Sequence, residues 1–110
     1  ADPLAYGMPD DGIAFFVRSQ VFDAVDRRDV DVFNRYAGDD YLASGWAHGA
    51  DDRLAGAVAG VRIALGDGQV ILHAFEPAFR AQPHGTFKLI FNGIYYGATD
   101  NRPISTHCVT

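Results

Sequence analysis

Residues 60–75, "GVRIALGDGQVILHAF", carry the strongest local signal in the sequence. Asp67 and Gly68 stand between two apolar runs, a pattern typical of a β-hairpin whose type I′ turn has positive φ at both central residues. A turn at Asp67-Gly68 gives an apolar face that pairs Leu65 with Val70, Ile63 with Leu72 and Val61 with Ala74. The other face is mixed and pairs Ala64 with Ile71 and Arg62 with His73. The stretch therefore predicts an antiparallel hairpin with one wholly apolar face.

An amphipathic helix is predicted after Gly85. Apolar residues recur there at helical spacing, namely Phe87, Ile90, Phe91, Ile94 and Ala98. Lys88, Asn92 and Tyr96 form a separate stripe. We expect Thr86 or the preceding glycine to cap the helix, and we expect Phe87 and Phe91 to face the hairpin.

The chain before the hairpin is predicted to supply further strands. Short apolar runs indicate strands at residues 13–17 and 21–25, and the alternation in "VDVFNRYA" indicates one from Val30. Residues 38–57 are rich in Gly and Asp and predict a loop, with a helical turn that Asp51 or Asp52 caps. The expected fold class is α+β, with a mainly antiparallel sheet and one C-terminal amphipathic helix packed on it. We expect a single domain over residues 1–98 and a polar C-terminal tail over residues 99–110.

The size and charge of the chain limit the possible functions. Its 110 residues are enough for one small hydrophobic core. The net charge of −5 disfavours a nucleic-acid partner, because proteins that bind phosphate backbones gather Lys and Arg on one face. No window reaches the roughly 18 apolar residues of a membrane span. Cys108 is the single cysteine, so an internal disulfide is excluded. The start at Ala1 leads us to expect a processed product or a fragment.

Several short motifs have the residue types of catalytic or metal sites, but their spacing disfavours such chemistry. His73 and Glu76 form an HxxE motif, with His84 as a third possible ligand, yet residues three apart on a strand point to opposite faces. Ser44 and His48 lack a nucleophile elbow. His107-Cys108 lies in the tail, and the Asp pairs 39/40 and 51/52 lack the spacing of a calcium loop. We therefore predict neither catalytic residues nor a metal site in this chain.

Glu76, Arg80, His84 and Thr86 form a polar group between the hairpin and the helix. A helix N-terminus offers free N–H groups and the positive end of the helix dipole, both of which favour an anion. These four residues are the candidate ligand-binding site, for an anion or a carboxylate. In the alternative interpretation, Arg80 pairs with Glu76 and closes the loop.

The residues "SGW" (44–46), "LAG" (54–56) and above all "FEPAFRAQPHGTFKLIFN" (75–92) resemble a C-terminal region of large bacterial zinc carboxypeptidases of the carboxypeptidase A type. That region is similar to a degenerate class I glutamine amidotransferase domain. The resemblance runs from "DPLAYGMP" to Gly97. It implies that the chain is the second half of an α/β domain of this type.

The resemblance also implies that the amidotransferase chemistry is lost. In active members a His-Pro-Glu motif serves a cysteine nucleophile, whereas here Glu76 stands at the position of the histidine and Ala78 follows Pro77. The zinc and the catalytic residues of the peptidase belong to a different domain of such proteins, so no cofactor is expected in this chain. The same resemblance implies a secreted or periplasmic location.

Two functions follow as hypotheses. The first is a non-catalytic accessory region that packages or positions the catalytic domain of a zinc carboxypeptidase, or recruits its substrate. The alternative is a small-ligand binding module that uses the loop 76–86. A half-domain leaves apolar surface uncovered, so we further expect the isolated chain to form a homo-oligomer.

Overall fold

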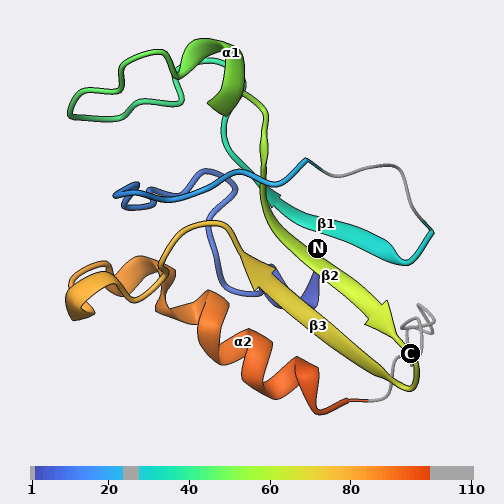
Figure 1. The fold of residues 1–110 in the computed structure, drawn as a ribbon. Coiled ribbons are helices and arrows are strands. Elements are labelled where there is room, and N and C mark those ends of the chain that lie inside the picture. The colour runs from blue at the N-terminus through green and yellow to red at the C-terminus, as the bar shows by residue number, and fades with distance from the viewer. Residues whose placement is uncertain (1, 24–27, 100–110) are drawn as a thin grey trace, which may run out of the picture.

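The structure is a computed structural model that describes residues 2–23 and 28–99. It has one sheet in the order β1-β2-β3, antiparallel throughout, and one long helix, α2, which confirms the α+β class (Figure 1). The strands are β1 (Val30–Arg35), β2 (Val58–Leu65) and β3 (Gly68–His73), and the helices are α1 (Asp51–Leu54), α2 (Phe87–Gly97) and three 3-10 turns, η1 (Pro3–Ala5), η2 (Phe79–Ala81) and η3 (His84–Thr86). None of the described helices is long and apolar enough to cross a membrane.

The hairpin is present, but its turn lies one residue earlier than the predicted Asp67-Gly68. Leu65 pairs with Gly68, so the two turn residues are Gly66 and Asp67. Gly66 has a φ of 58°, and Asp67 is not among the residues with positive φ. A type II′ turn needs glycine only at its first central position, which explains the shift. Val61 therefore pairs with Leu72 instead of Ala74, yet every side chain keeps its predicted face, because each partner moves by two residues.

The predictions for the region before the hairpin are only partly correct. The strand from Val30 is confirmed as β1, which pairs with β2 through a bulged register. Residues 13–17 are not a strand, and of the predicted strand 21–25 only Phe22 makes a bridge, to Val58. Residues 24 and 25 lie outside the described part. The helical turn α1 forms, but its N-cap is Ala50 instead of an aspartate.

Helix α2 presents a different face to the sheet from the one that its apolar stripe predicted. Leu89 is fully buried, whereas Phe91, expected to point inward, is 55% exposed. Gly93 and Gly97 lie over Ile71 of β3, where an added Cβ would be at ordinary contact distance. Two glycines without side chains let the helix rest on Ile71, and this rotates the phenylalanine outward. Thr86 does occupy the N-cap, but without a capping hydrogen bond from its side chain.

The N-terminal segment packs against α2 through the polar stripe of the helix. Asn92 donates from Nδ2 to the carbonyls of Leu4 and Tyr6, at 3.1 and 2.9 Å. The ammonium group of Lys88 donates to the carbonyl of Gly7. Leu4 is completely buried in this arrangement. The stripe of α2 that looked solvent-facing in the sequence therefore fastens residues 2–7 to the fold.

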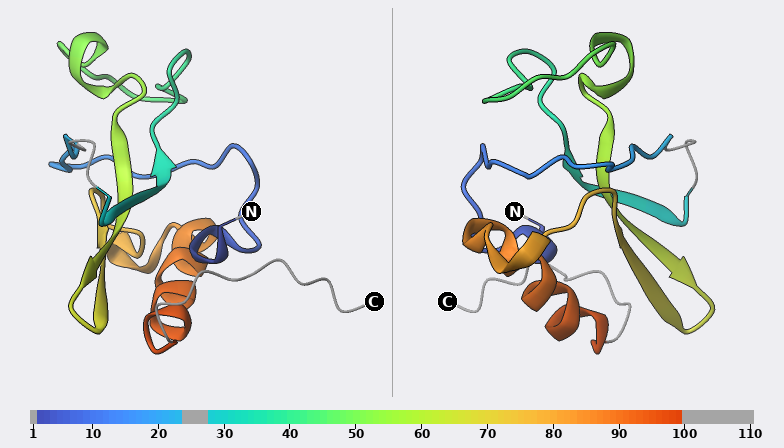
Figure 2. Two further views of the ribbon diagram at one scale, coloured as in Figure 1. Left: turned by 90° about the vertical axis from the view of Figure 1, so that its right-hand side faces the viewer. Right: turned by 60° about the vertical axis from the view of Figure 1, so that its left-hand side comes forward.

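Helix α2 and the N-terminal segment lie on one side of the sheet only, as Figure 2 shows. The core between the two layers is small and includes Ala59 of β2, Leu89 of α2 and Phe75, with Phe33 and Met8 packed around it. Arg62 crosses this side of the sheet, since its guanidinium donates to the hydroxyl of Tyr96 and to Asp31. The opposite side of the sheet has no helix over it.

Candidate functional site

The four residues of the predicted ligand site do not share one environment. The side chains of Glu76, Arg80 and His84 are exposed, whereas Thr86 is buried. The guanidinium of Arg80 lies 5.2 Å from the ring centroid of Phe79, and the predicted alternative, an ion pair between Arg80 and Glu76, is not formed. Nε2 of His84 is 3.1 Å from the carbonyl oxygen of Ala81.

Thr86 has a structural task in this loop. Its hydroxyl lies within hydrogen-bond distance of the carbonyl oxygens of both Pro77 and Pro83, and donates its proton to one of them at a time. The Pro83 carbonyl also accepts the backbone N–H of Thr86, whereas the Pro77 carbonyl lies outside any helix or strand, so the buried hydroxyl gives that acceptor a donor. Thr86 thus ties the two ends of the loop 77–86 together. This use leaves its hydroxyl without a proton for a ligand.

The backbone at Arg80 and Ala81 is strained. Their φ angles are 49° and 56°, in the left-handed region that residues other than glycine seldom adopt. Each such residue costs on the order of 1 kcal/mol or more unless the surrounding structure holds it. Here the strain turns the loop back on itself and leaves the Arg80 side chain exposed above Phe79.

His73 is a half-buried ring among aromatic neighbours and does not pair with Arg62. It faces Gly60 across the strands, and its ring makes an edge contact with the ring of Phe33 at 5.6 Å. Burial lowers the pKa of His73. Its Nδ1 is buried without a hydrogen-bond partner. Glu76 lies beyond the end of β3 and its side chain is exposed, whereas the His73 side chain is half-buried.

The remaining motifs form no reactive group in the described residues. His48 stacks against Trp46, with 5.8 Å between ring centroids, and Ser44 is exposed in the same loop. Within residues 2–23 and 28–99, no three His, Cys, Asp or Glu side chains lie close enough to hold a metal ion. His107 and Cys108 lie outside the described residues.

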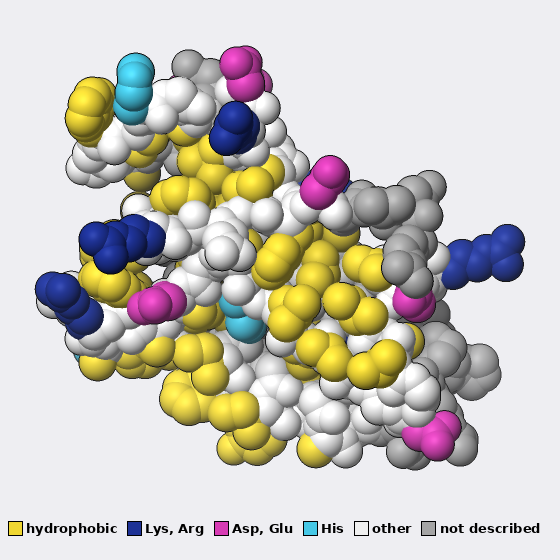
Figure 3. Space-filling model, in the orientation of Figure 1, with side chains coloured by type: hydrophobic (Ala, Val, Ile, Leu, Met, Phe, Trp, Pro, Cys, Tyr) yellow, Lys and Arg dark blue, Asp and Glu magenta, His cyan; other side chains and the backbone are white. Residues whose placement is uncertain are grey.

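The uncovered side of the sheet is an apolar surface, which we call the open sheet face. The register places the following residues on it: Val30 and Val32 of β1, Val61, Ile63 and Leu65 of β2, and Val70 and Leu72 of β3. Leu65 is 68% exposed, Val70 37% and Leu72 39%, whereas Val61 is buried at 4%, so the exposed part of this face lies toward the hairpin turn and β3. Figure 3 shows hydrophobic side chains gathered over the strands on this side. An antiparallel sheet with one solvent-facing side normally has polar residues on that side and apolar residues on the packed side. An apolar side toward solvent therefore indicates that a covering layer is missing.

A second apolar surface follows the outer side of α2. Phe91, Ile94 and Tyr95 are all more than half exposed there, and we call them the outer helix stripe. Phe91 and Ile94 belong to the apolar stripe predicted from the sequence, and Phe91 was expected to face the hairpin. Two separate surfaces of this chain therefore expose large apolar side chains.

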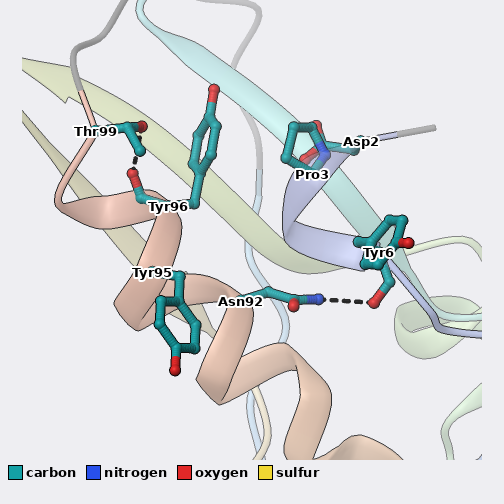
Figure 4. A pocket seen from close by; sticks show the side chains of 7 residues that line it. All are labelled: Asp2, Pro3, Tyr6, Asn92, Tyr95, Tyr96 and Thr99. Carbon is teal, nitrogen blue, oxygen red and sulfur yellow. Dashed lines mark hydrogen bonds between the residues drawn. The ribbon is translucent and has the colours of Figure 1, made fainter.

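A cavity of about 400 Å³ lies between α2 and the N-terminal segment. Figure 4 shows Tyr96 and Pro3 on opposite sides of it, with Tyr6 and Asn92 below them. Its lining consists of Asp2, Pro3, Tyr6, Asn92, Tyr95, Tyr96 and Thr99. A second cavity, of about 480 Å³, is lined by Arg35, Arg53 and Asp23 together with backbone near Gly56. In that cavity the guanidinium of Arg35 already donates to the Gly56 carbonyl.

Comparisons of the chain with protein-family models, with curated proteins and with solved structures found no match. The resemblance to the carboxypeptidase region therefore stays a hypothesis.

Neither the cavity at the N-terminal segment nor the exposure of the outer side of α2 was predicted from the sequence. One signal for the cavity was present, since Lys88, Asn92 and Tyr96 form a polar stripe on an otherwise apolar helix. Their partners are backbone carbonyls more than eighty residues away, in the case of Lys88 and Asn92. A carbonyl has no residue type, so no pattern in the sequence identifies it as a partner.

Proposed function

We propose that this chain is a non-catalytic accessory region whose open sheet face packs against a larger domain. The observation that carries the proposal is the apolar face of the sheet, with Leu65, Val70 and Leu72 exposed on it. Transfer of apolar surface out of water stabilises a complex by roughly 25 cal/mol for each Å² buried. Large uncovered apolar patches mark interaction sites on soluble proteins.

The resemblance of residues 75–92 to a region of zinc carboxypeptidases suggests what this larger domain is. It is the catalytic domain of a zinc carboxypeptidase of the carboxypeptidase A type, which would carry the zinc and the catalytic residues itself. In that arrangement this chain positions the peptidase domain or recruits its substrate. The buried, backbone-bonded hydroxyl of Thr86 supports a structural use of the loop 77–86.

A binding experiment in trans tests the docking. The chain and a separately produced zinc carboxypeptidase domain of this type are mixed and separated by size. We expect the wild-type chain to co-elute with the peptidase domain, and the double variant Val70→Thr, Leu72→Thr to elute alone. Threonine is β-branched, a shape that strands favour, and it adds a hydroxyl to the apolar face. Phe91→Thr, on the outer helix stripe, is the matched control and should still co-elute.

Enzyme assays test the non-catalytic part of the proposal. The purified chain is expected to release neither glutamate from glutamine nor the terminal residue from a peptide above a blank. Turnover of either substrate that persists through repeated purification would contradict the proposal. If the double variant of β3 co-elutes as well as Phe91→Thr does, the docking surface is not the open sheet face.

A second candidate function is a small-anion or carboxylate binding module at the loop 76–86. The strained backbone at Arg80 and Ala81 favours it, because such strain gathers at ligand sites. The test is thermal unfolding in the presence of phosphate or free amino acids. This candidate requires a saturable rise in melting temperature that Arg80→Ala abolishes and that Arg28→Ala, another exposed arginine outside the loop, leaves unchanged.

A further inference from the structure

The cavity beside α2 is lined by aromatic rings, of which Tyr96 is held in place, whereas Tyr6 and Tyr95 are 77% and 79% exposed. Tyr96 is fixed by the guanidinium of Arg62, which donates to its hydroxyl at 2.9 Å. Asn92 fixes the backbone of Tyr6 by donating to its carbonyl, and Pro3 faces Tyr96 across the opening (Figure 4). Tyr95 is turned to the outer rim. The cavity is therefore present before any ligand arrives, and its size lies within the range of small-molecule sites.

The charges around the cavity favour a cation. Asp2 is the one charged residue of its lining, and only Oδ1 of its carboxylate is used, as the acceptor for the Leu4 N–H at 2.9 Å. Arg62 lies behind Tyr96, with its guanidinium carbon 5.4 Å from the ring centroid; it forms an ion pair with Asp31 and is also attracted by Asp2, so it offsets part of the negative charge at the site. The net charge of the chain, −5, adds to the attraction.

Aromatic faces and a single carboxylate match one kind of ligand. The face of a tyrosine ring attracts a cation through its quadrupole, and a bulky, weakly hydrated cation loses little hydration on entering such a site. A metal ion or a primary ammonium group would need more oxygen ligands than Asp2 supplies. We propose that this cavity binds a small quaternary ammonium compound of the choline type. This proposal is independent of the docking function above, because the residues that line the cavity belong to the N-terminal segment and to α2 and its C-terminal end, and none of them lies on the open sheet face.

Titration calorimetry with two probes of the same shape tests the proposal. Choline carries a trimethylammonium group, and 3,3-dimethyl-1-butanol carries an uncharged tert-butyl group in its place. We expect choline to bind saturably and at least tenfold more tightly than the neutral alcohol, because the attraction to rings and carboxylate needs the charge. Equal binding of the two probes, or no saturable binding of choline, would overturn the proposal.

Two variants locate the site. Tyr6→Leu removes an exposed ring, and Asp2→Asn removes the charge but keeps an oxygen for the Leu4 N–H; each is expected to weaken choline binding at least fivefold. The controls are Phe91→Leu, which also replaces an aromatic ring by leucine, and Asp10→Asn. Both residues are exposed and lie outside the cavity lining, so these variants should bind choline like the wild type. Melting temperatures verify that the variants fold. A peptide with trimethyl-lysine serves as a further probe, and binding of this peptide without binding of choline would contradict the small-molecule assignment.

Discussion

Leu89 and Phe91 are two residues apart on α2 and have opposite surroundings. Leu89 is 1% exposed and belongs to the core, whereas Phe91 points outward. Leu89→Ala should lower the free energy of unfolding by about 2 to 5 kcal/mol, through lost burial and a residual cavity. Phe91→Ala should change it by only about 0.5 kcal/mol, as surface substitutions do. Chemical denaturation of both variants measures the difference. Equal losses would mean that α2 is rotated from the orientation described.

The stability of the fold should fall in mild acid because of His73. Burial lowers its pKa below the ordinary value of 6.5, so the unfolded chain binds a proton more readily than the folded one. The contribution of neutral His73 is therefore complete above pH 6.5 and is lost as the pH falls toward the lower pKa of the folded state. Denaturation curves across this window should show the loss.

The variant His73→Phe should remove this part of the pH dependence, since a phenylalanine beside Phe33 and Phe75 has no proton to gain. The exposed His48 supplies the control, because His48→Gln should leave the loss in place. If both variants lose stability with acid as the wild type does, another group is responsible.

At the scale of the elements, the same substitution at two glycines should change the free energy of unfolding in opposite directions. A Cβ on Gly60 of β2 would lie 2.6 Å from the ring of Phe33, which His73 flanks, so Gly60→Ala should cost about 1 to 3 kcal/mol. A Cβ on Gly93 of α2 would lie 3.9 Å from Ile71, an ordinary contact. Gly93→Ala should therefore stabilise the fold by about 0.5 to 1 kcal/mol, because alanine favours the helix. Thermal denaturation should move the two melting temperatures in opposite directions.

The hairpin and the helix were predictable from the sequence because their signals are local. Turn glycines and apolar periodicity identified both, although the turn moved by one residue to Gly66-Asp67. The face of α2 was not predictable from its strongest apolar stripe. Its orientation depends on the fit of Gly93 and Gly97 against Ile71, which is a tertiary contact. Residues 13–17 had the composition of a strand but pair with none of the three strands of the described sheet, which their composition could not show.

The candidate ligand site was predictable only in part. The position of Thr86 at the helix start follows from the sequence, and the structure confirms it at the N-cap. The use of its hydroxyl does not follow, because the acceptors are the carbonyls of Pro77 and Pro83 in an irregular loop. The left-handed backbone of Arg80 could not be predicted from the sequence either, because arginine seldom adopts that conformation.

At the scale of the whole molecule, we expect the isolated chain to associate through the open sheet face. A second copy that packs face to face would bury Leu65, Val70 and Leu72 of both copies. A stable interface of this kind exceeds about 1,000 Å². Light scattering should give the mass of a dimer or a larger oligomer, and Val70→Thr with Leu72→Thr should return it toward the monomer.

Association through the sheet edges is the competing route, since β1 and β3 are both edge strands. A proline in β3, Gln69→Pro, would block pairing through the β3 edge while leaving the apolar face intact, so an oligomer that survives it does not form through that edge. A monomeric mass at all concentrations, with no binding of a hydrophobic dye, would contradict association altogether.

The attachment of Leu4 to α2 has a consequence for how the chain folds. The hydrogen bond from Asn92 to the Leu4 carbonyl spans 88 positions of the sequence. Contacts between such distant residues close a long loop, and their entropic cost delays them relative to the hairpin, whose partners are neighbours. Synthesis proceeds from the N-terminus, so Leu4 is made before α2, which carries its binding site. The nascent chain must therefore carry an unburied leucine until α2 has been made, and a premature stop before α2 leaves that leucine without its binding site.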